Sequence, residues 1–220
     1  MKGIVFDLDD TLYNEKDFVY GGFQEVALYL SHKYVLDNTV LYQQMIDILY
    51  KQGRGKIFDI ICEQYAFKED ISALVELYRR ARPKLHLYED AETFLRDNLG
   101  KYKLGLITDG LYYVQWNKIK LLDIEKYFDE MIVTDDYGKE FWKPSKAPYI
   151  EMSQRLELPF NEMVYIGDNP NKDFYAAKQL GILTIRIIRE QGDFINIFLN
   201  EDYEADFIVR NLYEVEKFLK

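Results

Sequence analysis

The sequence has a single cysteine, no long apolar run and no excess of basic residues. With only Cys62, no disulfide forms within the chain. The apolar runs are far too short to cross a bilayer, and no basic and apolar leader precedes the first predicted strand. Lys and Arg number 28 against 38 Asp and Glu, a net charge of −10, which argues against a nucleic-acid or anionic-membrane surface. We therefore expect a soluble cytoplasmic protein that binds neither nucleic acid nor membrane.

Two further kinds of pattern are missing. No Gly-x-Gly-x-x-Gly follows a predicted strand, which argues against dinucleotide binding. There is no internal repeat and no low-complexity linker. What is present is typical of a globular protein: 220 residues, 48% of them hydrophobic, with 19 Tyr and 14 Phe. That length fits one large domain or a domain with a smaller one inserted.

The periodicity of apolar residues divides the chain into two kinds of segment. Residues 3–7 are predicted to form a buried strand, and residues 14–83 show apolar residues three and four apart, typical of helices. Beyond Pro83 the pattern alternates. Strands are expected at 103–108, 130–134, 163–167, 182–188 and 206–209, and helices at 90–99, 111–122, 147–156, 171–181 and 212–220.

Alternating strands and helices indicate an α/β fold with a parallel sheet. We expect a Rossmann-like core, with helices on both faces of the sheet, built from residues 1–13 and 84–220. Residues 14–83 are expected to form an inserted all-helical domain. Because this insert follows the first strand directly, it is expected to cover whatever lies at that strand's end.

Polar side chains follow four of the predicted strands, where ligands bind in open parallel sheets. Each alone has a simple structural explanation, such as a helix cap or a solvated lysine. Their coincidence at one sheet edge favours a common site. These residues are, in chain order, Asp7, Asp9 and Thr11, then Thr108 and Asp109, then Lys143, then Asp168 and Asp173.

The side chains at this edge suit phosphoryl transfer. Asp7 and Asp9 would face one point if the strand conformation persisted, and both would stay ionised only beside a cation. Mg²⁺ prefers one or two carboxylates plus a phosphate oxygen, and Asp168 would be the second carboxylate ligand. One carboxylate can attack phosphorus while the other transfers protons, and a hydroxyl and an ammonium stabilise the phosphoryl oxygens.

The segments "DLDDT" (7–11), Thr108, the Lys143-Pro pair and "GDNPNKD" (167–173) resemble the four motifs of the haloacid dehalogenase superfamily. Most members of that superfamily are Mg²⁺-dependent phosphatases. The resemblance spans the whole chain, and the helical insert matches the position of the family's first type of cap domain.

The resemblance implies a role for each acid. Asp7 would be the nucleophile and a metal ligand. Asp9 would be the general acid and base, with its backbone carbonyl on the metal. Asp168 would ligate Mg²⁺, and Asp173 would hold a water or Lys143 behind it.

The remaining motif residues would bind the phosphoryl group or shape the loop. Thr108 and the Asp109 amide would bind the transferring group, Lys143 would neutralise it, and Thr11 would orient the first loop. Two features depart from the family pattern. Asp109 stands where asparagine is frequent, and the third motif reads "YGKEFWKPSKAP", which leaves Lys139 and Lys146 as alternatives to Lys143.

Within the family, an acid at position 9 favours phosphoryl transfer over dehalogenation, which needs neither this acid nor a metal. We expect hydrolysis of a small soluble phosphomonoester. A phosphosugar mutase on the same core is the alternative, and a phospho-acceptor signalling domain is less favoured because such domains lack a cap. Arg54 and Lys56, in the turn "QGRGK", either contact the substrate or form a solvated turn. The sequence leaves the physiological substrate and the oligomeric state open.

Overall fold

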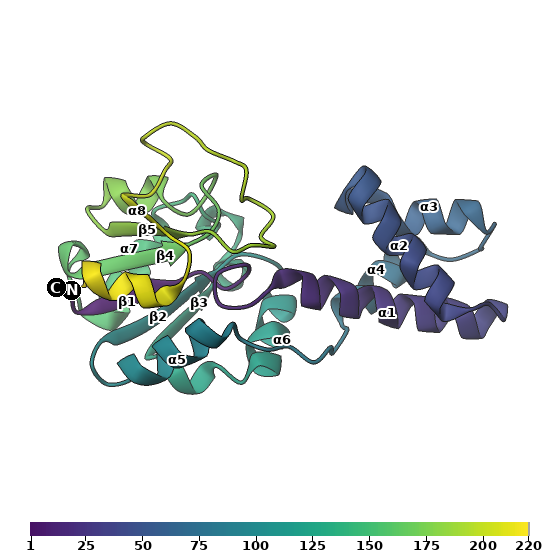
Figure 1. Cartoon of the computed structure of the whole chain (residues 1–220), viewed down its shortest axis with the longest axis horizontal. Helices are drawn as coiled ribbons and strands as arrows, with labels where there is room; N and C mark the ends of the chain where they lie inside the picture. Colours follow the sequence, from purple (N-terminus) through teal and green to yellow (C-terminus); the bar gives the residue numbers. More distant parts are fainter. Residues whose placement is uncertain (220) are drawn as a thin grey trace. The chain divides into compact units, whose positions relative to one another are not determined.

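The computed structural model describes residues 1–219 and shows two compact units. Among the described residues, unit one comprises 1–15 and 86–219, and unit two comprises Lys16–Leu85. The first is an α/β structure and the second is helical (Figure 1). The assignment of the helical unit as a cap stays a prediction.

The α/β unit is built on a six-stranded sheet in which every paired strand is parallel, in the order β3-β2-β1-β4-β5-β6. The central position of β1 puts its carboxyl end between those of β2 and β4, where the order of strands along the chain reverses. The predicted parallel α/β fold is therefore confirmed. The strands are β1 (Gly3–Phe6), β2 (Lys103–Thr108), β3 (Glu130–Val133), β4 (Met163–Gly167), β5 (Leu183–Ile187) and β6 (Phe207–Val209).

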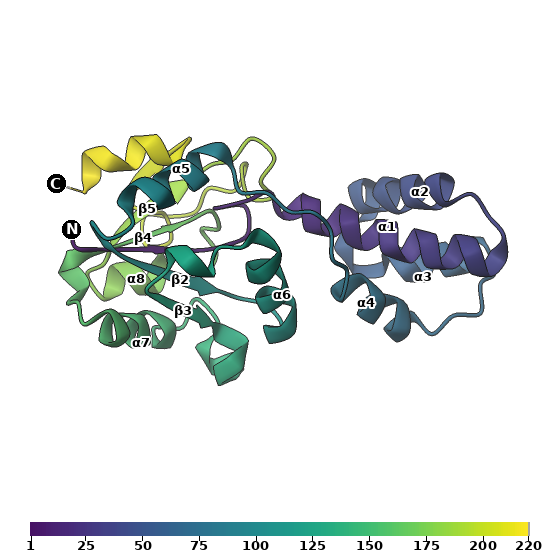
Figure 2. The same ribbon diagram turned by 90° about the horizontal axis from the view of Figure 1, so that it is seen from below.

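Helices cover both faces of this sheet, which requires strands that are apolar on both sides. Figure 2 shows α5 (Glu89–Asn98) on one face and α7 (Ala147–Leu156) and α8 (Tyr175–Gln179) on the other. Alternate residues of β1 serve the two faces: Val5 packs in the cluster with Tyr149 and Met152 of α7, and Phe6 packs edge-on against Phe94 of α5. A further α-helix of this unit, α6 (Tyr112–Leu122), follows β2.

Two predicted helices of this unit are wrong in extent or type. The helix predicted at 171–181 begins only at Tyr175, because the Asn169 side chain accepts the backbone N–H of Asn171 and holds the preceding residues in a turn. The closing segment is a 3₁₀ helix, Leu212–Phe218, which Asn211 caps through the N–H of Glu214. The end of that prediction, residue 220, lies outside the described residues.

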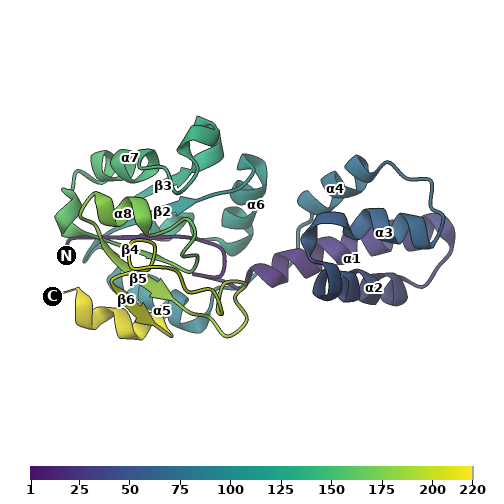
Figure 3. The same cartoon turned by 90° about the horizontal axis from the view of Figure 1, so that it is seen from above.

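The described secondary structure of the helical unit consists of α1 (Glu15–Tyr34), α2 (Asn38–Gln52), α3 (Ile57–Gln64), α4 (Ile71–Arg79) and a short 3₁₀ turn (Figure 3). Asp37 and Asp70 cap α2 and α4 by accepting backbone N–H groups of the first turn. The four helices enclose their own apolar core, which includes Phe23, Leu30 and Met45. Across residues 1–219, every helix falls short of the length and apolar character that a membrane crossing requires.

Candidate active site

Asp7 is the first residue beyond β1 and is 1% exposed. Its backbone N–H donates to the carbonyl of Ile166 on β4 at 2.8 Å, which extends the sheet pairing by one residue and fixes the Asp7 backbone. The Asp7 carboxylate accepts a hydrogen bond of 2.6 Å from Lys143 Nζ. The apolar strand therefore holds a single carboxylate rigidly at the centre of the sheet edge.

Two more carboxylates, Asp168 and Asp173, follow β4 and lie beside Asp7. One oxygen from each of the three lies within 4.8 Å of the others, and all three residues are buried. The close approach depends on Gly167, because a Cβ at that position would lie 2.5 Å from Asp173 Oδ2. Asp173 is held in turn by the N–H of Asn169, at 2.9 Å. Strand ends that are distant in sequence thus form one acidic cluster, Asp7, Asp168 and Asp173.

Lys143 supplies positive charge to this cluster. Its side chain is completely buried, and Nζ contacts Asp7 at 2.6 Å, Asp173 at 2.7 Å and the Tyr165 hydroxyl at 2.8 Å. Burial alone would lower the pKa of Lys143, but the two carboxylates outweigh burial and raise it well above its ordinary value. The alternatives, Lys139 and Lys146, are both exposed. Of these three candidates, Lys143 is therefore the lysine that contacts the acidic cluster.

The charges of the acidic cluster are unbalanced. Burial raises the pKa of Asp7 to about 6, although Lys143 opposes the shift. The pKa of Asp168 is raised well above its ordinary value, by burial and then by repulsion from Asp173 and Asp7. Only Asp173, whose burial is outweighed by Lys143 and Lys172, has a lowered pKa. Three buried oxygen ligands short of compensating charge have the chemistry that a hard divalent cation prefers.

Thr108 is the last residue of β2 and Asp109 follows it, so both lie at the same sheet edge. Thr108 is fully buried, and its Oγ1 accepts a hydrogen bond of 2.6 Å from Gln115 Nε2. The Asp109 carboxylate accepts from the Thr134 hydroxyl at 2.8 Å and from the Lys143 backbone N–H at 3.3 Å, and it pairs with Lys172 at 3.8 Å. These three contacts compensate the charge of Asp109, which explains how an acid is tolerated at a position where asparagine is frequent in the family.

Asp9 lies outside the strand, because β1 ends at Phe6 and Asp9 forms only an isolated bridge with Tyr13. The strand conformation on which the expected facing of the Asp7 and Asp9 carboxylates depended therefore does not continue to Asp9. The Asp9 carboxylate instead accepts from Lys118, from Gln115 and from the Tyr13 hydroxyl. Burial would raise the pKa of Asp9, but these donors lower it. Its roles as proton carrier and carbonyl ligand stay predictions.

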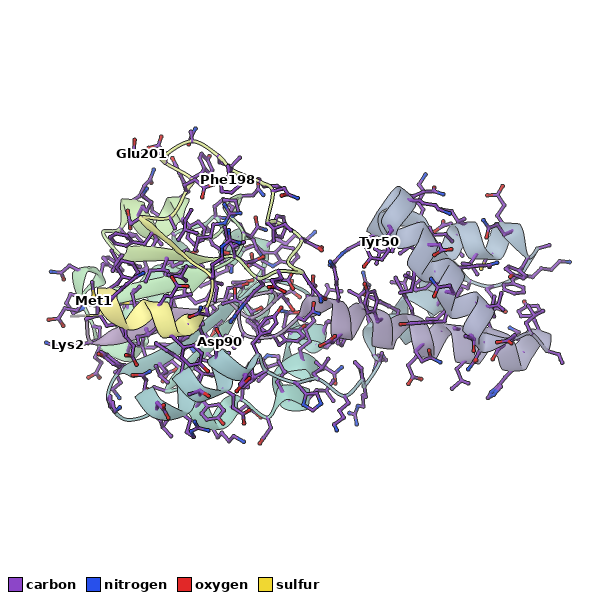
Figure 4. All side chains as sticks on the ribbon, in the orientation of Figure 1. Met1, Lys2, Tyr50, Asp90, Phe198 and Glu201 are labelled. Carbon is purple, nitrogen blue, oxygen red and sulfur yellow. The ribbon has the colours of Figure 1, made fainter. Side chains whose placement is uncertain are left out.

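Asp10 and Thr11 shape the loop that carries these acids. Asp10 has a φ of 51°, and its carboxylate accepts the N–H groups of Glu15 and Asp193, so it is a structural residue. The backbone carbonyl of Thr11 accepts two hydrogen bonds from Arg189, which also donates to the Asp90 carboxylate. Asp90 is labelled in Figure 4. The Thr11 hydroxyl is buried without a hydrogen-bond partner among the described residues. Contacts of the Thr11 backbone therefore anchor the loop.

Gln115, Lys118 and Tyr13 contact Asp9 and were not identified from the sequence. Gln115 and Lys118 lie three residues apart on α6, directly after the "TDG" turn, and so share one helix face. Both are buried, at 2% and 4% exposure. The sequence feature that could have identified Gln115 and Lys118 is their spacing, which places both polar residues among the apolar residues on the buried side of the helix.

Arg54 and Lys56 lie in the helical unit, between α2 and α3, and both are exposed. Arg54 lines a pocket of about 310 Å³ together with Phe23, Phe58 and Tyr78. A contact between these basic residues and a substrate stays a prediction.

Comparisons with known proteins agree with this arrangement. Residues 4–187 match the family described as haloacid dehalogenase-like hydrolase. The glyceraldehyde 3-phosphate phosphatase of Methanocaldococcus jannaschii is 31% identical, over 100% of this chain and 97% of that protein. That of Methanopyrus kandleri is 28% identical, over 86% and 84%. The crystal structure of a haloacid dehalogenase-type phosphatase from Thermococcus onnurineus superposes with a TM-score of 0.65 at 28% identity, covering 100% and 98%. The chain belongs to the haloacid dehalogenase-like hydrolases.

Proposed function

We propose that the protein is a Mg²⁺-dependent phosphatase that hydrolyses a small phosphomonoester through an aspartyl phosphate on Asp7. The observation that carries this proposal is the acidic cluster, in which a rigid, buried Asp7 is paired with Lys143. Two relatives named as glyceraldehyde 3-phosphate phosphatases support the reaction class. They also make glyceraldehyde 3-phosphate the first natural substrate to test.

In the first step, an Asp7 carboxylate oxygen attacks phosphorus and the bond from phosphorus to the ester oxygen breaks. Asp9 gives a proton to the leaving alkoxide. Thr108 and Lys143 donate hydrogen bonds to the phosphoryl oxygens, on which charge is spread in the transition state. The products of this step are the free alcohol and the aspartyl phosphate.

In the second step, Asp9 takes a proton from water, and the water oxygen attacks phosphorus. The bond from phosphorus to the Asp7 oxygen breaks, which regenerates the carboxylate and releases inorganic phosphate. This step requires ionised Asp9, and the contact with Lys118 favours that form, whereas the first step requires protonated Asp9, which the same contact disfavours.

The carboxylates of Asp7 and Asp168 would hold Mg²⁺, with the Asp9 carbonyl as a further oxygen ligand. When bound, Mg²⁺ offsets the negative charge of the carboxylates and of the phosphoryl group. Asp173 keeps Lys143 in place behind them, through the 2.7 Å ion pair.

The alternatives predict different products. The purified protein is expected to release phosphate from p-nitrophenyl phosphate and glyceraldehyde 3-phosphate when Mg²⁺ is present, and to stop when EDTA removes the metal. A mutase would instead isomerise a sugar phosphate faster than it releases phosphate, and would need a bisphosphate activator. A phospho-acceptor domain would stay phosphorylated with negligible turnover. Either of these results would reject the phosphatase.

Mg²⁺ binding is expected to release protons, and to release more at pH 6 than at pH 8. Without metal, the pKa of Asp7 is about 6 and that of Asp168 is raised well above its ordinary value. A fraction of the Asp7 and Asp168 carboxyls is therefore protonated near pH 6. A bound cation favours the ionised carboxylates and so displaces those protons. Calorimetry in two buffers of different ionisation enthalpy measures the number released. Identical binding heats in both buffers at pH 6 would contradict the expectation, and Asp168→Asn, as the control, should weaken Mg²⁺ binding itself.

A further inference from the structure

The Gln115 side-chain amide lies between two groups of the proposed reaction. Its Nε2 donates to Thr108 Oγ1 at 2.6 Å and to Asp9 Oδ2 at 2.9 Å. An amide nitrogen carries two hydrogens, so one atom satisfies both contacts. The reverse orientation of the amide would set Oε1 against the Asp9 carboxylate, which is an unfavourable contact between two acceptors.

The Gln115 contact fixes the direction of the Thr108 hydroxyl. Because Oγ1 accepts the amide hydrogen, the hydroxyl's own hydrogen points away from Gln115 and is left to donate elsewhere. We propose that Gln115 is a positioning residue for phosphoryl transfer, which fixes Thr108 as a hydrogen-bond donor and holds the Asp9 carboxyl beside it. This inference rests on the proposed function, in which Thr108 donates to the phosphoryl oxygens and Asp9 transfers protons.

The surroundings keep the Gln115 amide in place. Gln115 lies in the first turn of α6 and is 2% exposed. Gly110, in the preceding turn, has a φ of 137°, and a Cβ there would lie 3.1 Å from Cγ, Cδ and Oε1 of Gln115. A residue larger than glycine at position 110 would therefore be strained and would crowd the amide.

Lys118 and Tyr13 complete the support of Asp9. Lys118 Nζ donates to both carboxylate oxygens, at 2.8 and 3.0 Å, and the Tyr13 hydroxyl donates to Oδ1 at 2.6 Å. Gln115 donates to both Asp9 and Thr108, and it therefore couples the position of Asp9 to the phosphoryl-binding hydroxyl.

The test is a pair of double-mutant cycles on kcat/KM for p-nitrophenyl phosphate. Gln115→Met, which keeps the length of the side chain and removes the donor, is expected to lower kcat by about tenfold with little change in KM. This is less than the roughly 10²–10³ lost with a donor that touches the reacting group itself, because Gln115 acts through Thr108 and Asp9. If Gln115 acts through Thr108 and Asp9, the loss is expected to fall below about threefold in the Thr108→Val background and again in the Asp9→Asn background. The same change at an exposed glutamine of α7, Gln154→Met, is the control and should leave kcat unchanged.

If Gln115→Met lowers kcat/KM by the same factor in the wild-type protein, in Thr108→Val and in Asp9→Asn, the proposal is overturned. A loss that comes only from damage to the fold does not depend on Thr108 or Asp9. If Gln115→Met does not fold, Gln115→Glu decides, since it keeps the volume but replaces the donor with an acceptor. Wild-type kcat in Gln115→Glu would overturn the proposal, and a loss of at least about tenfold would support it. The proposed function fails separately, through a fully active Asp7→Asn variant.

Discussion

Asp7→Asn is expected to lower the turnover of p-nitrophenyl phosphate by at least about 10³-fold, because loss of a nucleophile removes the covalent route altogether. The asparagine amide has nearly the shape of the carboxylate, so Asp168 and Asp173 should keep their places. The amide offers no anionic oxygen to phosphorus, however, and it leaves Lys143 a neutral acceptor in place of the carboxylate that Lys143 contacts at 2.6 Å. Phosphate release by a coupled assay measures the loss, and trapping of radiolabelled phosphate on the wild-type chain identifies the intermediate.

Asp10→Asn is the matched control, since it makes the same chemical change three residues away. The Asp10 carboxylate accepts only backbone N–H groups in the described contacts, from Glu15 and Asp193, and burial raises its pKa to about 6. An amide there keeps the acceptor for one of these two N–H groups and loses it for the other, but it leaves the Asp7 carboxylate and its contacts in place, so activity should stay within a few-fold of wild type. If both variants lose activity equally, charge in the loop matters rather than Asp7 itself, and the proposed nucleophile is wrong.

The sequence predicted the sheet well because its strands are short apolar runs followed by turns. β2 and β4 occupy the predicted residues, 103–108 and 163–167, and parallel pairing follows from the helices between strands. The carboxyl ends of parallel strands share one edge, so the approach of Asp7, Asp168 and Lys143 could be predicted without coordinates.

The sequence did not show where Asp9 points, because side-chain direction after a strand depends on where the strand conformation stops. Period-two alternation places Asp9 beside Asp7, but the strand ends at Phe6 and the Asp9 carboxylate meets Lys118. That contact joins residues 109 positions apart and depends on how α6 packs. The contacts of Gln115 also depend on how α6 packs, so the sequence alone shows Gln115 only as an ordinary helical residue.

Lys143→Met is expected to abolish most activity and to destabilise the fold by about 3–5 kcal/mol at pH 8, because it leaves partners of a buried ion pair uncompensated. The Lys143 side chain is fully buried between Asp7 and Asp173, both of which would then lack their ammonium partner. Urea unfolding monitored by circular dichroism measures the free energy of unfolding. Lys146→Met, at an exposed lysine three residues on, is the control and should change that free energy by less than about 0.5 kcal/mol.

The pH dependence of this destabilisation separates lost charge from lost packing. Without Lys143, the pKa of Asp7, which folding already raises, rises further, and the pKa of Asp173 rises as well because one of the two lysines that lower it is gone. A carboxyl whose pKa is raised by folding binds more protons in the folded state, so stability falls as pH rises through that pKa. The deficit of Lys143→Met relative to wild type is therefore expected to shrink as the pH is lowered from 8 to 5, and to shrink at pH 8 when Mg²⁺ is added, because either change supplies the missing positive charge. A deficit that is the same at both pH values and with or without Mg²⁺ would mean that Lys143 acts through the packing of its methylene groups, and the charge balance inferred for the acidic cluster would be wrong.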